Sequence, residues 1–432
     1  MPPLAVLRDL RLQRRKWKDL KSNLLNIHRT ALPYQRMPQT QPTPASVAPL
    51  WTNQPGAASM YINSVAVCSD ASRIVAGTFF HAYGSIRPTE AAALKPVDAS
   101  QDGTYGTYCY DAAGKLTWKN EFVGWQGVYW VDISDDGTVA ASGGWFTNTP
   151  TYAGFVRAFD AATGAMLLDV RTSGRVSQVD LSGNGAWLLA ASESLTLYKR
   201  QSDGTFKATG SFVPPGTGNS IVTAALSTDG SWAVCGDYLG SIYLFENEGG
   251  MLALNKAWPL PSGGYSHCVR ITPEGSAFAV GGGSGWFYLL DRNAFIAGGP
   301  PLVSYQVANQ GSVYGVAVSD DASTVVGISN LKAGSNEGGM VYSVSRSGAL
   351  QWSYQTDRNP NCASLLLEQN LLAVSDGHPD NTPGNFYLLD ARSGALIWKY
   401  GTPNMSWPIM LSGDGTSVAA GSDDSNVYFF KT

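Results

Sequence analysis

The residues of this chain that could do chemistry are few and scattered. It has only four histidines, at His28, His81, His267 and His378. The segment from Asp376 to Asp380, Asp-Gly-His-Pro-Asp, could offer carboxylate oxygens and one imidazole to a cation, but a solvated polar loop explains it better. No Ser, His and Asp follow an order typical of nucleophilic catalysis, and the glycines at 281–283 precede no helix pattern that would make a phosphate loop. We therefore predict neither catalytic residues nor a metal site.

Three charged residues share one position of a recurring pattern. Asp132, Asp180 and Arg270 each follow the first apolar residue of an alternating strand. They could line a central channel and bind a polar ligand. The favoured interpretation is that they form hydrogen bonds to the backbone of the next repeat, as such residues more often do.

The strand that carries these residues belongs to a unit that recurs eight times. The copies begin at Val65, Val131, Val179, Ala224, Val269, Val316, Leu365 and Ile409. Each has an alternating strand, a polar turn often ending in Asp-Gly or Asn-Gly, a strand of small residues and an aromatic-rich strand. Successive copies start between 44 and 66 residues apart. A repeat of this length built from short strands predicts an all-β fold, an eight-bladed β-propeller.

The fourth strand of each unit has a motif of its own. FDAATGAMLL ends at Leu168 and LDARSGALIW ends at Trp398, with Asp, Gly and the large residue spaced by four. Trp118 and Trp352 stand at the same place in two further copies. We expect these tryptophans to lie between neighbouring blades and to donate their indole N–H groups.

This motif resembles that of the quinoprotein alcohol dehydrogenase-like superfamily of eight-bladed propellers, whose blades carry A-x-D-x-x-T-G-x-x-x-W. The resemblance implies one propeller over residues 49–432. Active members bind a quinone and a Ca²⁺-type ion and use a catalytic Asp, and many have a disulfide between adjacent cysteines. This chain has no Cys-Cys pair and no C-x-x-C-H haem site, so it is similar to a non-catalytic member without a cofactor. The WD-repeat family fits less well, because no Trp-Asp dipeptide occurs.

The two ends of the repeat region predict how the ring closes. The last copy ends after three strands, whereas residues 49–53 precede the first copy as an isolated strand. We predict that these residues supply the fourth strand of the eighth blade, which leaves no free sheet edge in the ring.

A basic segment precedes the propeller. Residues 1–48 hold nine Lys or Arg and two Asp, a net charge of +7, so the rest of the chain carries −11 of the total of −4. Residues 1–30 are predicted to form an amphipathic helix and the proline-rich residues 31–48 a linker. The residues predicted to bind a partner are Val6, Leu10, Trp17, Leu20, Leu24, Ile27, Arg14, Arg15 and Lys18.

Three uses of this helix stay open: docking on a partner protein, folding back on its own propeller, and attachment to a membrane surface or targeting to an organelle. Docking on a partner is favoured. Nucleic acid is not expected as a partner, because the acidic propeller would repel phosphates.

Long connections between second and third strands are predicted in blades 1, 2, 6 and 7, and all emerge on one face of the ring. Long loops on a rigid scaffold are usual binding sites. The residues predicted to contact a partner there, or at the channel mouth, are Tyr83, Arg87, Trp130, Trp145, Tyr152, Tyr314, His378, Asn381 and Trp407.

Composition sets the remaining expectations. The five cysteines contain no C-x-x-C pair, and no apolar run reaches the roughly 20 residues of a membrane-spanning helix. A cytoplasmic location is favoured, with a periplasm or organelle lumen as alternatives. The preferred function is a non-catalytic interaction scaffold, an accessory subunit anchored by its helix. The alternatives are a small-ligand-binding or quinone-dependent propeller using the channel mouth, and a peripheral membrane protein.

Overall fold

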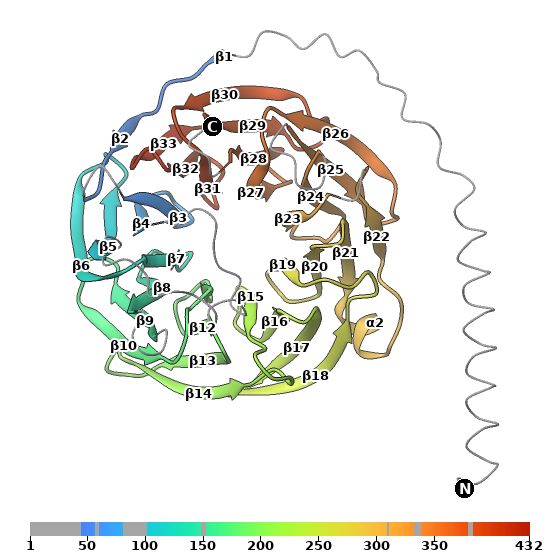
Figure 1. The fold of residues 1–432 in the computed structure, drawn as a ribbon, viewed down its shortest axis with the longest axis horizontal. Helices are drawn as coiled ribbons and strands as arrows, with labels where there is room; N and C mark the ends of the chain where they lie inside the picture. The colour runs from blue at the N-terminus through green and yellow to red at the C-terminus, as the bar shows by residue number, and fades with distance from the viewer. Residues whose placement is uncertain are drawn as a thin grey trace, which may run out of the picture. The chain divides into compact units, whose positions relative to one another are not determined.

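The structure, a computed structural model, describes residues 45–56, 60–80, 102–147, 153–308, 311–331, 338–378 and 383–432. In this part of the chain, antiparallel sheets follow one another around a ring (Figure 1). The innermost strand of each sheet lies nearest to the centre of the ring and the outermost forms the rim. The prediction of an all-β fold is confirmed.

The described strands form eight four-stranded units. The first two units share one eight-stranded sheet, joined where Phe79 pairs with Gly127. They contain β3 (Tyr61–Val67), β4 (Arg73–Phe79), β5 (Asp102–Asp111) and β6 (Leu116–Trp125), then β7 (Gly127–Ile133), β8 (Val139–Thr147), β9 (Ala153–Asp160) and β10 (Met166–Thr172).

The next three units are separate four-stranded sheets. They contain β11 (Gln178–Leu181), β12 (Trp187–Ala191), β13 (Leu195–Arg200) and β14 (Phe206–Phe212), then β15 (Ile221–Leu226), β16 (Trp232–Asp237), β17 (Ser241–Glu248) and β18 (Met251–Pro259), then β19 (Ser266–Ile271), β20 (Ala277–Gly282), β21 (Trp286–Asp291) and β22 (Val303–Gln306). A short helix, α2 (Arg292–Ile296), lies between β21 and β22.

The last three units complete the ring. They contain β23 (Val313–Val318), β24 (Thr324–Asn330), β25 (Gly339–Ser345) and β26 (Leu350–Thr356), then β27 (Pro360–Leu366), β28 (Leu371–Asp376), β29 (Gly384–Asp390) and β30 (Leu396–Thr402), then β31 (Ser406–Leu411), β32 (Ser417–Ser422) and β33 (Val427–Lys431).

Segments far apart in the sequence meet in the last unit. β2 (Trp51–Asn53) pairs antiparallel with β33 and supplies the fourth strand of that sheet. The preceding β1 (Ala45–Ser46) pairs in parallel with β30 at the rim of the neighbouring sheet. Figure 1 shows the start of the described chain beside its C-terminal strand.

One register is common to all eight described units. In each, a residue of the first strand pairs with the residue eleven positions later, as Val65 does with Ala76 and Ile409 with Ala420. In the seventh unit this residue is Ala363, which pairs with Val374. The predicted start at Leu365 was therefore wrong by two residues, a shift that keeps the same face of the strand because side chains alternate with a period of two.

The core lies between the sheets. Among the described residues, eight buried apolar clusters each join two neighbouring units, and each contains the residue of the common register. Val65, for example, lies with Ala419 and Phe429 in the cluster that joins the first unit to the last. Burial of apolar surface therefore stabilises the ring at every junction.

The expected tryptophan contacts are present at two junctions. The indole Nε1 of Trp118 donates to the carbonyl oxygen of Ala161 at 2.8 Å, and that of Trp352 donates to Ala391 at 2.9 Å. Both rings are buried against the next sheet. This prediction is confirmed for these two residues.

Residues 1–44 lie outside the described part of the chain, as does the predicted helix of residues 1–30 with its partner-binding residues. Among the residues that are described, none of the helices is long and apolar enough to cross a membrane.

Candidate partner-binding cavity

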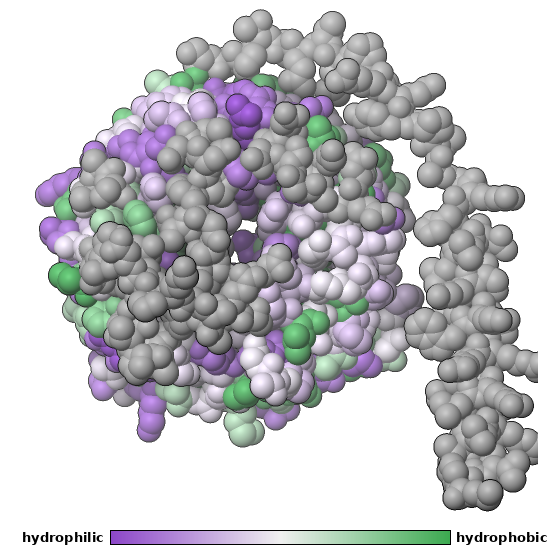
Figure 2. Space-filling model, viewed as in Figure 1, coloured by the Kyte–Doolittle hydropathy of each residue, from purple (hydrophilic) through white to green (hydrophobic). Residues whose placement is uncertain are grey.

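A cavity of about 380 Å³ occupies the centre of the ring. Figure 2 shows the central hollow on the viewed face. In each of the eight described units, at least two consecutive residues in the first strand or just before it line the cavity. These are Asn63 and Ser64, Tyr129 and Trp130, Ser177 and Gln178, Val222 and Thr223, His267 and Cys268, Tyr314 and Gly315, Asn361 and Cys362, and Trp407 and Pro408.

A β-bulge explains why two consecutive residues can face the same space. In seven of the eight described first strands the register shifts at this position, so that one residue, or two in the eighth unit, has no direct partner on the second strand. Tyr129 is such a residue, between the pairs of Val128 with Gly144 and Trp130 with Gly143. Bulges re-aim side chains, and here they aim residues into the cavity that would otherwise face the preceding sheet.

Aromatic rings dominate one part of the cavity wall. Tyr238 stacks on Tyr265, whose ring centroid is 4.2 Å from that of His267, and His267 lies 5.1 Å from Tyr314. Burial lowers the pKa of His267 to about 4, which keeps the imidazole neutral near pH 7. This series of rings comes from the fourth, fifth and sixth units.

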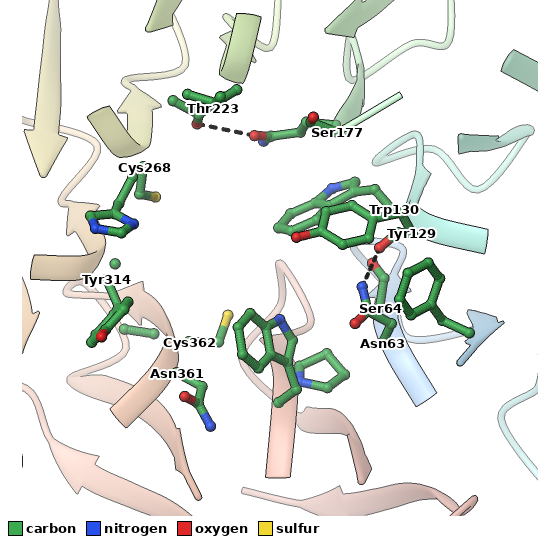
Figure 3. Close-up of a pocket in the computed structure, with 18 of the residues that line it drawn as sticks. Asn63, Ser64, Tyr129, Trp130, Ser177, Thr223, Cys268, Tyr314, Asn361 and Cys362 are labelled. Carbon is green, nitrogen blue, oxygen red and sulfur yellow. Dashed lines mark hydrogen bonds between the residues drawn. The ribbon is translucent and has the colours of Figure 1, made fainter. Parts of the chain in front are cut away.

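A second aromatic group lies on the wall of the first and second units. Phe79 packs edge-on against Tyr129 and is stacked near Trp145, with centroid distances of 5.3 and 6.4 Å. Arg175 caps this group, because its guanidinium carbon lies 4.4 Å from the Tyr129 ring and 4.9 Å from the Trp145 ring. Figure 3 shows Tyr129 and Trp130 opposite Tyr314 across the cavity.

The polar wall residues tie neighbouring sheets together. The Ser64 hydroxyl accepts a hydrogen bond from the backbone N–H of Val131 at 3.0 Å. The Gln178 amide oxygen accepts from the hydroxyl of Thr223 at 3.1 Å, and the Thr223 oxygen in turn accepts from the N–H of Val269. These bonds satisfy edge groups of the inner strands, so the wall is held in a fixed arrangement.

The interpretation of Asp132 and Asp180 as backbone ligands is confirmed. Each carboxylate accepts a hydrogen bond of 2.6 Å from an N–H of the next sheet, Asp132 from Leu181 and Asp180 from Leu226. Arg270 differs, because its guanidinium donates to the carbonyl oxygen of the adjacent Val269.

Burial shifts the ionisation of this acidic pair. Burial raises the pKa of Asp180 to about 6, against the opposing effects of its hydrogen bond from Leu226 and the charge of Arg270. Burial and the charge of Asp180 raise the pKa of Asp132. The pair therefore holds protons more tightly than exposed carboxyls do.

The segment around Asp376 differs from the expected solvated loop. Asp376 is fully buried at the end of β28, and its carboxylate accepts from the hydroxyl of Tyr387 at 2.6 Å and from the side-chain amide of Asn385 at 2.9 Å. The loop prediction was wrong for this residue because a tyrosine of β29 reaches back to it. Among the described residues, no group of three or more His, Cys, Asp or Glu could hold a metal ion.

The structure brings together four of the residues predicted to contact a partner. Trp130, Trp145, Tyr314 and Trp407 all line the cavity. His378 is described but is not among the lining residues. Tyr83, Arg87, Tyr152 and Asn381 lie outside the described residues.

Sequence reasoning missed several wall residues, which are Asn63, Tyr129, Arg175, Tyr238, Tyr265, His267 and Asn361. Four of them, Asn63, Tyr129, His267 and Asn361, stand two positions before the residue of the common register. An alignment of the copies would have shown that these residues share one position of the repeat. Strict alternation of side chains, however, assigns that position to the face that packs between units.

Comparison with known proteins shows the fold. No protein-family model and no curated protein matches the chain. Among solved structures, Sqt1 of Chaetomium thermophilum is similar, with a TM-score of 0.64 and 14% identity over 87% of this chain and 96% of that chain. Sqt1 bound to the N-terminus of the ribosomal protein L10 gives a TM-score of 0.62 and 14% identity, covering 87% of this chain and 97% of that chain. These matches show that the chain has the fold of a β-propeller.

Proposed function

We propose that this chain is a non-catalytic protein–protein interaction scaffold, an eight-bladed propeller that holds a segment of a partner protein at its central cavity. The observation that carries the proposal is the convergence of aromatic side chains from separate sheets on one cavity, including Trp130, Tyr314 and Trp407. All three remain partly exposed. Partly exposed aromatic residues around a concave centre are typical of interface hot spots.

The rigidity of the wall supports the same proposal. The bulged strands and the hydrogen bonds between sheets fix the aromatic groups before any partner arrives. A preformed site loses little conformational entropy on binding. The Sqt1 structure bound to the N-terminus of the ribosomal protein L10 is an example of a similarly folded protein with a partner segment.

We further propose that residues 1–30 form a basic amphipathic helix that anchors the propeller in a larger assembly in the cytoplasm. Its charge of opposite sign to the propeller and its apolar stripe support this. A relationship to the quinoprotein-like propellers is supported by the contacts of Trp118 and Trp352 with the turns of the next sheets.

The test compares three full-length tagged proteins purified natively from cells of the source organism, with mass spectrometry of co-purifying proteins. One is the natural chain, one carries Trp130→Ala and Trp407→Ala in the cavity, and one carries Met251→Ala and Leu254→Ala. The last two residues are exposed on the outer strand β18, at 62% and 48%, and provide a control for loss of exposed apolar surface.

A stoichiometric partner that the control retains and the cavity variant loses supports the proposal, provided that the purified partner binds the natural chain directly. A partner retained equally by both variants would place the interface elsewhere. A monomer in all three preparations would contradict the scaffold function. Removing residues 1–44 from the natural chain tests the anchor separately.

A further inference from the structure

The charge of the cavity wall is opposite to that of the propeller as a whole. Residues 49–432 carry a net charge of −11. The described lining of the cavity nevertheless contains two arginines, Arg175 and Arg270, and no Asp or Glu. A basic concave site in an acidic body attracts anionic groups locally, because the charges nearest to the ligand dominate at short range.

The two arginines differ in how their charges are balanced. Arg270 interacts electrostatically with Asp180 and Asp132, which lie near it at the inner strands. Arg175 lies in the connection between β10 and β11, and its buried side-chain Nε has no hydrogen-bond acceptor among the described residues. Its described contacts are with the faces of Tyr129 and Trp145.

This arrangement prepares Arg175 to bind an anion. A guanidinium stays charged at any physiological pH, and stacking on rings leaves its edge of N–H donors available. Two aromatic rings also limit the orientations that the side chain can take. An anion that reached this edge would form charge-assisted hydrogen bonds in a partly desolvated site, where they are stronger than in water.

We propose that Arg175 recognises the carboxylate of an Asp or Glu side chain in the partner segment that the cavity holds. This inference rests on the proposed function and names the chemistry of its partner. The residue next to the acidic one would be aromatic or aliphatic and would contact the rings of Trp130 and Tyr314. The size of the cavity, about 380 Å³, suits a few side chains and lies within the usual range for ligand pockets.

The test uses the full-length protein and a positional-scanning library of hexapeptides with acetylated N-termini and amidated C-termini. In these peptides only Asp and Glu supply a carboxylate. The best peptide and its Glu→Gln or Asp→Asn counterpart are then titrated against the natural protein, Arg175→Gln and Arg171→Gln. Arg171 is the matched control, because its guanidinium also lies over a ring, 3.3 Å from the centroid of Phe146, but does not line the cavity.

We expect selection of Asp or Glu at one position, and roughly ten- to hundredfold weaker binding when either the peptide carboxylate or Arg175 is neutralised. Neutralising both should cost no more than either change alone, because the two groups act on each other. Arg171→Gln should bind as the natural protein does.

The other outcomes separate this inference from the proposed function. The selected peptides could lack an acidic residue and depend on Trp130 and Trp407 but not on Arg175. That result would overturn the recognition of a carboxylate by Arg175 and would still support the scaffold function. Selection of acidic peptides that Arg175→Gln binds equally well would also overturn the role of Arg175. A complete lack of peptide binding would count against both.

Discussion

The indole Nε1 of Trp118 donates a hydrogen bond to the carbonyl oxygen of Ala161 across the junction between the first two units, at 2.8 Å. Trp398 occupies the corresponding place at the junction of the last two sheets, yet its Nε1 has no acceptor among the described residues. The reason is topological. Ala161 lies in the turn that joins β9 to β10, whereas in the last sheet the fourth strand, β2, comes from the other end of the propeller and is not joined to β33 by a turn.

Trp118 and Trp398 are therefore a matched pair for comparison, because they differ in this hydrogen bond but are alike in burial and ring contact. Trp118 is 8% exposed with its ring 5.2 Å from that of Phe159, and Trp398 is 4% exposed with its ring 5.1 Å from that of Phe430. We predict that Trp118→Phe lowers the free energy of unfolding by about 1 kcal/mol more than Trp398→Phe does, because only Trp118 loses a hydrogen bond. Urea unfolding measures both. Equal losses would show that the bond contributes nothing net.

The turn that follows Ala161 depends on a glycine. Gly164 has φ of +75°, and an added Cβ would lie 2.7 Å from Trp118 Cγ. Gly348 occupies the same place in another unit with φ of +84°, but an added Cβ there would have no neighbour within 4 Å. Gly164→Ala combines the left-handed backbone with a collision, whereas Gly348→Ala has only the backbone cost of about 1–2 kcal/mol.

We therefore predict that Gly164→Ala lowers the free energy of unfolding by about 1–3 kcal/mol more than Gly348→Ala. Chemical denaturation of the two variants side by side provides the measurement. If the two lose the same amount, Trp118 moves aside without cost and the tight contact does not stabilise the junction.

The buried carboxyl pair predicts how stability depends on pH. The pKa of Asp180 in the folded protein, about 6, lies above the ~3.9 of an unfolded chain. The folded state therefore holds more protons between these values. The contribution of protonated Asp180 to the free energy of unfolding is fully present below about pH 4 and is lost as the pH rises through about 6.

Asp180→Asn removes this titration and keeps an oxygen that can accept from the N–H of Leu226. Between pH 4 and pH 7 we expect the natural protein to lose on the order of 2 kcal/mol of unfolding free energy relative to the variant. Urea unfolding at several pH values tests this. Curves that stay parallel for the two proteins would mean that Asp180 ionises normally.

The eight repeats predicted most of the ring, because alternation and turn residues such as Asp136 and Gly137 are local properties of the chain. The contacts of Trp118 and Asp132 could also be foreseen, since both follow from the position of a residue within its repeat. Tyr129 and His267 could not, because a bulge changes the face to which a residue points without any clear sequence signal. Arg175 is separated by 30 positions from Trp145, and only the folded sheets bring the two together.

The closure of the ring gives the last prediction. Trp51 in β2 stacks on Phe429 with a centroid distance of 5.2 Å and donates from Nε1 to the carbonyl oxygen of Ala112 at 3.1 Å. The side chain of Asn53 donates to the carbonyl oxygen of Gly114 at 2.6 Å. β2 thus joins the last sheet to the first.

A chain that lacks residues 1–53 should therefore unfold with a free energy lower by roughly 3 kcal/mol or more than a chain that lacks only residues 1–44, because it loses a packed tryptophan and one edge of a sheet. Urea unfolding of the two truncated proteins measures the difference. Trp51→Ala in the full-length chain measures how much of it comes from the stacking of Trp51 on Phe429. Equal stability of the two truncated proteins would mean that the propeller holds together through the apolar contacts of Val65, Ala419 and their neighbours alone, and that β2 only covers an edge that the ring can leave open.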